Sequence, residues 1–204
     1  VGALPDHLTF SPDGLKLVVA NEGEPSDDYT NDPKGSISII DVSNINQIRN
    51  DASSSLTLPV TTLDFTAYDS NKTELVAKGV RIFGKNASVS QDLEPEYVAI
   101  SADSTKAFVT LQENNALAFV DLLTPAITDI KPLGYKDYNA LGLAFDSNDK
   151  DKSYNPYPWP VLGMYQPDSI VSFTIDNAGP PVFQEVNSAS TNAAFTGGSI
   201  STSY

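Results

Sequence analysis

The chain has 204 residues, no cysteine and a formal net charge of −14, from 26 acidic and 12 basic side chains. This acidic balance disfavours a nucleic-acid partner, which needs a basic patch to replace phosphate counterions, and it disfavours binding to anionic membranes. The lack of cysteine excludes disulfides, thiolate catalysis and zinc–cysteine sites. No run of about 18 apolar residues occurs, so no membrane span is predicted.

The first 43 residues predict a β hairpin followed by a third strand. Strands are expected at 7–11 and 15–21, where β-branched and apolar residues dominate. The segment SPDG (11–14) between them has the Pro, Asp and Gly spacing of a tight turn. Apolar and polar residues alternate in 35–43, which indicates the third strand.

The stretch from 44 to 93 is less regular. A polar loop at 50–58 leads into a strand expected at 60–68. Residues 74–84 are ambiguous, because ELVAKG fits one helical turn and VRIF fits a strand. This stretch is either an insertion or a divergent second unit.

Residues 94–114 repeat the pattern of residues 4–24 at a spacing of 90 positions, as Pro5 and Pro95 show. A repeat of this kind indicates an architecture built from similar units. The second copy predicts strands at 96–101, 106–111 and 116–122. A third, partial copy begins at 166, where a Pro-Asp pair again precedes an apolar segment.

These units predict an all-β, β-propeller-like fold with antiparallel blades, in a single domain over 1–204 or in part of one. The expected repeat units are 4–43, 94–123 and a partial 166–176, with insertions at 44–93 and 124–165. A ring needs about four to eight blades, so we expect a partial propeller completed by a longer chain or by other subunits. The start at Val1 rather than Met suggests either a processed product or an excised piece of a longer chain.

Several segments resemble the choice-of-anchor I domain family: 1–43, GVRIFG (79–84), SVSQDLEPEYVAIS (88–101), TLQENNALAFVDL (110–122), PLGYKD (132–137) and WPVLGMYQPDSI (159–170). Bacterial surface and secreted proteins belong to this family, as do mesenchyme-specific cell surface glycoproteins, which are linked to biomineralisation. The resemblance implies a β-propeller-like fold outside the cytoplasm, periplasmic or secreted in a bacterium. After Asp176 the sequence departs from the family pattern.

The acidic loop after the second strand is the first candidate metal site. Calcium takes six to eight hard oxygen ligands, which carboxylates, Asn side chains and backbone carbonyls supply. The alternative is a solvated acidic loop. A second candidate is the Asp-rich segment 146–153, where a plain turn is the alternative because no EF-hand spacing is present. The predicted calcium ligands are Glu22, Glu24, Asp27, Asp28, Asp32, Asp149 and Asp151.

A third acidic group, Asp92, Glu94 and Glu96, precedes and opens the strand at 96–101. Alternation would place these carboxylates on one face of a strand, and a solvent face is the default interpretation.

Nucleophilic catalysis is poorly supported. His7 is the only histidine, no Gly-x-Ser-x-Gly elbow occurs, and we expect His7 on a half-buried strand. A calcium-dependent phosphoesterase, phytase- or alkaline-phosphatase-like, would need cationic groups, for which Arg81 and Lys85 are the best pair. No catalytic residue is assigned.

Two other surface features suggest ligands or modification. The aromatic and proline stretch 154–160 could offer a sugar- or peptide-binding platform through Tyr157 and Trp159, or simply pack as a loop. Asn71 and Asn86 each begin an Asn-x-Ser/Thr sequon, which accepts a glycan in a secreted eukaryotic protein.

We therefore predict an extracellular or cell-surface propeller module that binds calcium through acidic loops, with an adhesion, matrix or biomineralisation role. Matrix, mineral or glycan partners are expected. The alternatives are the calcium-dependent phosphoesterase and a carbohydrate-binding module.

Overall fold

The computed structural model describes residues 1–45 and 57–174, together with the backbone of 182–186. Two four-stranded antiparallel sheets form its centre, and in each the strands follow one another in chain order. Sheet 1 contains β1 (Pro5–Phe10), β2 (Lys16–Asn21), β3 (Ser36–Asp41) and β4 (Val60–Asp64). Sheet 2 contains β5 (Pro95–Ile100), β6 (Lys106–Leu111), β7 (Ala116–Asp121) and β8 (Ala126–Pro132).

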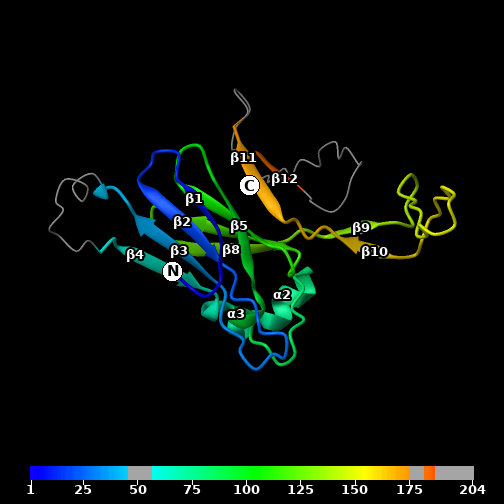
Figure 1. Ribbon diagram of the computed structural model, residues 1–204, viewed down its shortest axis with the longest axis horizontal. Coiled ribbons are helices and arrows are strands. Elements are labelled where there is room, and N and C mark those ends of the chain that lie inside the picture. The colour runs from blue at the N-terminus through cyan, green and yellow to red at the C-terminus, as the bar shows by residue number, and fades with distance from the viewer. Residues whose placement is uncertain (46–56, 175–181, 187–204) are drawn as a thin grey trace.

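Two smaller hairpins follow sheet 2 (Figure 1). Strands β9 (Tyr135–Asp137) and β10 (Leu162–Met164) form the base of an arm, residues 135–164, that projects away from the sheets. Strands β11 (Ser169–Phe173) and β12 (Val182–Val186) form the other small hairpin, which lies beside sheet 2 and begins at the third copy of the repeat, and which we call the third hairpin.

The two copies of the internal repeat fold alike, beginning with their first turns. The Ser11 hydroxyl donates to Asp13 Oδ1 and accepts from the Lys16 amide, which closes the turn between β1 and β2. Ser101, Asp103 and Lys106 make the same bonds between β5 and β6. The shared Ser-x-Asp spacing therefore encodes the hairpin turn.

The sheets stack face to face, and the same geometry recurs from one repeat to the next. We call the face of each sheet that meets the preceding repeat its leading face, and the face that meets the following repeat its trailing face. The trailing face of sheet 1 includes Val18 and Ala20, and it packs on the leading face of sheet 2, which includes Val98 and Val109. The trailing face of sheet 2 in turn packs on Ile170 of the third hairpin. The first strands consequently lie side by side, β1 next to β5 and β5 next to β11.

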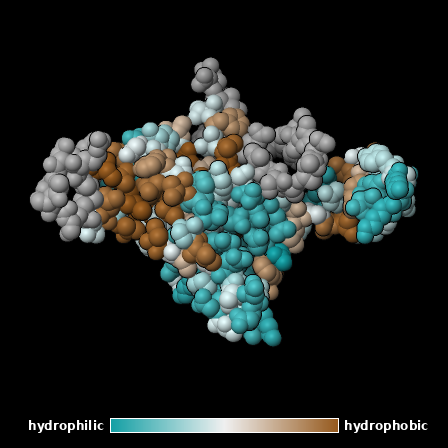
Figure 2. All heavy atoms as spheres, viewed as in Figure 1, coloured by the Kyte–Doolittle hydropathy of each residue, from teal (hydrophilic) through white to brown (hydrophobic). Residues whose placement is uncertain are grey.

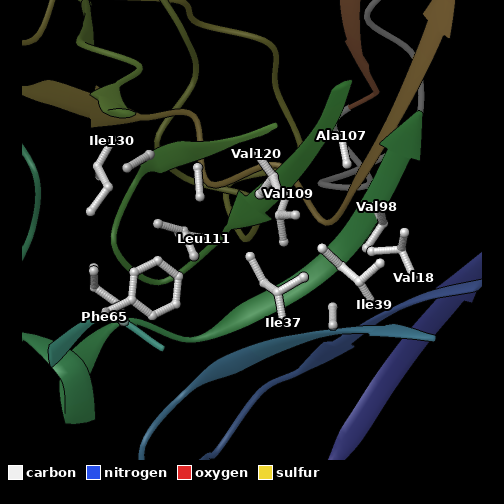
Figure 3. Close-up of a cluster of buried hydrophobic side chains, with 14 of the residues drawn as sticks. Val18, Ile37, Ile39, Phe65, Val98, Ala107, Val109, Leu111, Val120 and Ile130 are labelled. Carbon is white, nitrogen blue, oxygen red and sulfur yellow. The ribbon is translucent and has the colours of Figure 1, made fainter. Parts of the chain in front are cut away.

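The main core lies between sheets 1 and 2 (Figure 3). Val18, Ile37 and Ile39 of sheet 1 meet Val98, Val109, Leu111, Val120 and Ile130 of sheet 2. Phe65, which directly follows β4, closes one end and is fully buried. Each such side chain contributes about 1.5–3 kcal/mol through the hydrophobic effect, so burial between the two sheets stabilises their stacking.

On the leading face of sheet 1, the apolar side chains of β1 are not covered, although Val19 on the neighbouring strand is buried. Leu8 and Phe10 are 58% and 59% exposed, whereas the residues at the same repeat positions in sheet 2, Val98 and Ile100, are 2% and 7% exposed. Figure 2 shows the result as hydrophobic surface over the side of the molecule formed by β1 to β4. Sheet 1 thus ends the stack with exposed apolar side chains on β1.

The structure confirms a mainly β, antiparallel chain and corrects several local predictions. The strand expected at 60–68 ends at Asp64, and a 3-10 helix, η1 (Thr66–Asn71), follows it. The ambiguous segment forms helix α2 (Lys72–Lys78), while the VRIF residues 80–83 form no strand. Helix α2 ends at Gly79 in the left-handed conformation that favours glycine.

The stretches expected as insertions supply the fourth strand of each sheet. Strand β4 lies within 44–93 and β8 within 124–165, so each repeat continues beyond its expected end at 43 or 123. Most of the polar loop predicted at 50–58 lies outside the described residues. The short helix α3 (Val89–Asp92), capped by Ser88 with Gln91 in a capping box, leads into β5.

Candidate cation-binding site

The candidate site forms where the second strands end and the first strands begin. Gly35, just before β3, lies against the backbone that leads into β5. A Cβ at this position would collide with the Leu93 carbonyl oxygen and lie 2.6 Å from Pro95 Cδ and 3.1 Å from the Glu22 carbonyl oxygen. Only glycine therefore lets the segment after β2 approach the segment before β5 this closely.

This approach gathers a set of carboxylates that we call the acidic cluster: Glu22 after β2, Glu94 and Glu96 at the start of β5, and Glu113 after β6. Glu94 and Glu96 are buried, with 6% and 9% of their surfaces exposed. Asp6, Glu24 and Asp168 lie close enough for their charges to raise the pKa of one or more of the cluster's glutamates. Figure 2 shows hydrophilic surface over the middle of the molecule, beside the apolar side of sheet 1.

Burial and mutual repulsion change the acidity of the cluster. Burial first, and then the charge of Glu24, raises the pKa of Glu22 to about 7. Burial and the charge of Glu113 raise the pKa of Glu94 and that of Glu96 to about 8. Buried like charges disfavour ionisation, so Glu22, Glu94 and Glu96 retain protons near neutral pH when no cation balances them.

Several buried acceptors of this region have no hydrogen-bond donor. Among the described residues, Oε2 of Glu96, Oε1 of Gln112 and Oε2 of Glu113 are buried and unpaired. A fourth such atom, Oδ1 of Asn21, lies at the end of β2. All four are oxygens, the atom type that calcium prefers as a ligand.

The backbone around the cluster is held firmly. Asn114, fully buried, accepts from the Glu94 amide through Oδ1 and donates through Nδ2 to the carbonyl and Oδ2 of Asp92. Asp92 also accepts from the amides of Phe83 and Gly84. These bonds fix the start of β5, because buried polar groups are costly to leave unpaired.

The two cationic residues predicted to bind phosphate, Arg81 and Lys85, have different surroundings. Arg81 donates from Nη1 to the carbonyl oxygen of Glu113 at 2.9 Å, and its guanidinium lies 3.6 Å from the Phe83 ring centroid. It therefore supports the Glu113 segment. Lys85 is exposed in the turn before α3.

The structure separates the predicted calcium ligands of the first acidic loop. Glu22 and Glu24 lie at the acidic cluster, but Asp27 and Asp28 are exposed farther along the loop. Asp28 Oδ1 accepts from the hydroxyls of Ser26 and Thr30, which lowers its pKa. Burial raises the pKa of Asp32, and the nearby charge of Asp92 raises it further.

The second predicted group lies at the far end of the arm. Asp149 and Asp151 are exposed in the loop 146–155, which is drawn well away from the sheets in Figure 1. Asp151 accepts from the Ser153 amide, and Asp146 accepts from the amides of Asn148 and Asn155. This loop is a series of side-chain-closed turns.

The arm carries the aromatic residues considered for sugar binding. Tyr157 and Trp159 are 60% and 36% exposed, with ring centroids 5.4 Å apart at an angle of 66°. Trp159 Nε1 donates to the Phe145 carbonyl, and a bridge pairs Phe145 with Tyr157. The rings are therefore held in place while part of their surface faces solvent.

His7 lies half-buried on β1, as expected, and joins two sheets. Its ring stacks on Tyr97 with centroids 3.6 Å apart, and its Nδ1 accepts from the Val98 amide at 3.2 Å. Burial lowers the pKa of His7, which favours the neutral ring that this bond requires. The two sequon residues, Asn71 and Asn86, are both exposed.

Glu22 and Glu24 were predicted from the sequence as calcium ligands. Glu94 and Glu96 were expected on a solvent-facing surface, and Glu113 was not predicted as a ligand. One signal was available. The pairs Pro5-Asp6, Pro95-Glu96 and Pro167-Asp168 stand at equivalent points of the three copies. Repeated carboxylates converge if the copies pack side by side, as β1, β5 and β11 do.

In the described parts of the chain, no three His, Asp or Glu side chains already form a group able to hold a metal ion, so binding would require the carboxylates to close around it. No helix in these parts is long and apolar enough to cross a membrane. A comparison with curated proteins finds no match. The family model of the choice-of-anchor I domain matches residues 1–179, and the chain therefore belongs to the choice-of-anchor I domain family.

Proposed function

We propose that this chain is a cell-surface or extracellular module that binds calcium at the acidic cluster and serves adhesion, matrix or mineral contacts. Membership in the choice-of-anchor I family supports the placement. The convergence of Glu22 with Glu94, Glu96 and Glu113 is the observation that carries the calcium proposal. A divalent ion would relieve both the repulsion and the unpaired acceptors of this region.

Isothermal titration of chelator-treated protein with calcium tests this function. We expect saturable binding, weakened at least about tenfold in the double variant Glu22→Gln/Glu24→Gln, because lost coordination weakens metal affinity strongly. The matched control is Asp149→Asn/Asp151→Asn, which removes two exposed carboxylates from the arm and should bind as the unchanged protein does. No heat and no thermal shift at millimolar calcium would refute the proposal.

We further propose that the stack of sheets is part of a β-propeller. Each junction pairs a trailing face with a leading face, and the first strands lie in one row, as around a propeller axis. The apolar leading face of sheet 1 would then receive the trailing face of another repeat. The intact mass of the natural protein tests this: a mass well above 21.8 kDa supports further repeats, and a monomer of 21.8 kDa contradicts them.

A carbohydrate surface on the arm is the second candidate function. The exposed, fixed rings of Tyr157 and Trp159 support it, because sugars stack on aromatic faces. A glycan array should then show binding that Trp159→Ala abolishes. Binding that survives this substitution would place the sugar site elsewhere.

The calcium-dependent phosphoesterase alternative uses the same acidic cluster with Arg81 as the phosphate partner. Its support is the position of Arg81 beside Glu113. Turnover of phytate or a generic phosphomonoester with calcium, lost in Glu24→Gln, is the expected result. Absence of turnover from pH 5 to 9 would remove this alternative.

A further inference from the structure

Carboxylates at equivalent repeat positions meet at one end of the row of first strands. Asp6, Glu96 and Asp168 each follow the proline that precedes or opens a first strand. Because β5 lies between β1 and β11, Glu96 lies between its two equivalents, and the charges of both act on it. The repeat thus places a carboxylate on either side of Glu96.

The middle position differs from its neighbours in burial. Asp6 and Asp168 are exposed, but Glu96 is only 9% exposed because repeats pack on both sides of its strand. Its Oε2 has no hydrogen-bond partner, and neither has Oε2 of Glu113. A buried carboxylate oxygen without a donor is costly, so a cation is the natural partner for these two atoms.

Protein cations do not meet this need. Within the parts of the chain that the structure describes, the ion pairs are Lys78–Glu74 and Lys131–Asp129, neither of which includes a member of the acidic cluster. Arg81 contacts the backbone oxygen of Glu113 and the Phe83 ring.

We infer that Glu96 and Glu113 of sheet 2, together with Glu22 of sheet 1, ligate one calcium ion that links the two sheets. This inference rests on the proposed calcium-binding function and adds its ligands and its effect on the fold. Calcium fits better than magnesium, because it accepts flexible sets of many oxygens, whereas magnesium demands a near-ideal octahedron. The exposed Asp6 and Asp168 would then form the acidic rim of the site.

Two measurements on the whole chain test the inference. Calcium titrations should show affinity lowered at least about tenfold in Glu96→Gln and in Glu113→Gln, but unchanged in the rival-loop controls Asp28→Asn and Asp149→Asn. Hydrogen exchange should show the Val98 amide, which bonds to His7 across the two sheets, protected at least about tenfold by calcium. Circular dichroism of each variant confirms that it is folded, and magnesium should give weaker protection.

The outcomes separate the two proposals. If the unchanged protein binds no calcium, the proposed function and this inference both fail. If it binds calcium equally well in Glu96→Gln and Glu113→Gln, or loses binding in Asp28→Asn, the site is a loop site and only this inference fails. Binding at the cluster without protection of Val98 overturns the link between the sheets.

Discussion

At the scale of single residues, side chains accept hydrogen bonds from backbone amides that strand pairing leaves without a partner. The pairing of β5 with β6 is irregular between Pro95 and Val98. The Tyr97 amide bonds to Thr110 Oγ1, and the Val98 amide bonds to His7 Nδ1. His7 therefore serves the junction between the sheets, and its neutral form matters because only an unprotonated Nδ1 accepts a hydrogen bond.

Replacing His7 tests this role. His7→Phe keeps a ring to stack on Tyr97 but leaves the amide of Val98, a buried residue, without an acceptor. We expect a loss of about 1–3 kcal/mol in the free energy of unfolding, the usual cost of an unsatisfied buried donor. Urea denaturation measures it, and an unchanged midpoint would show that the hydrogen bond contributes nothing.

The acidic cluster predicts how stability depends on pH. The folded pKa values of Glu94 and Glu96, about 8, and of Glu22, about 7, exceed the ordinary 4.5, so the folded state binds more protons between pH 4.5 and 8. In chelator, stability should fall as pH rises through this window. His7, with its lowered pKa, acts oppositely below about 6.5, but three carboxyl groups outweigh one imidazole.

Urea denaturation at pH 5 and pH 8 in chelator measures this dependence. The stability of the double variant Glu94→Gln/Glu96→Gln should depend less on pH than that of the unchanged chain, because two of the three carboxyl groups that titrate in this range have been removed. Stability that rises from pH 5 to pH 8 in chelator would contradict the burial of these charges.

At the scale of elements, the repeat unit is a four-stranded meander whose turns and glycines determine how units meet. The Ser-x-Asp turn is the same in both copies, but Gly35 belongs to the first copy alone, in the extra loop before β3. The close approach at Gly35 joins that loop to the start of β5. One element thus both connects the sheets and delivers Glu22 to the cluster.

Gly35→Ala should therefore be strongly destabilising. The added Cβ meets backbone at Leu93 and the ring of Pro95, which cannot move aside easily, so we expect a loss of about 1–3 kcal/mol or more. Gly14→Ala is the control: its φ of +72° costs about 1 kcal/mol, but open space surrounds it. Thermal unfolding compares the two, and equal effects would deny the importance of the close approach.

At the scale of the whole molecule, the sheets form a stack that ends in exposed apolar side chains on β1. Equivalent positions therefore have different energetic roles in the two sheets. Ile100 is 7% exposed within the main core, and its repeat equivalent Phe10 is 59% exposed on the leading face of sheet 1. The difference comes from the neighbours, because the two positions occupy the same place in the repeat.

The paired substitutions Ile100→Ala and Phe10→Ala measure this difference. Ile100→Ala should cost about 2–5 kcal/mol through lost burial and a cavity, and Phe10→Ala should stay within about 0.5 kcal/mol. In a longer protein with further repeats, Phe10→Ala should become costly as well. A large loss from Phe10→Ala in the 204-residue chain would mean that this face is already covered.

The repeat, the turns and most strands could be predicted from the sequence, because hydrophobic alternation and Pro, Asp and Gly spacing are local properties. The sequence also identified the family through specific segments. The strand at 60–68 was predicted, but its end at Asp64 was not, and neither was strand β8, whose residues pair with β7 rather than repeat a motif.

Which carboxylates meet depends on the tertiary fold and could not be predicted from the sequence. Asp27, Asp28, Asp149 and Asp151 have strong acidic patterns, yet their loops hold them in solvent. Glu96 and Glu113 have weak patterns, yet the stacking of β1, β5 and β11 buries Glu96, where the charges of Glu113 and Glu22 act on it. Burial and proximity depend on how distant segments pack, and that packing is what turns scattered negative charge into a candidate cation site.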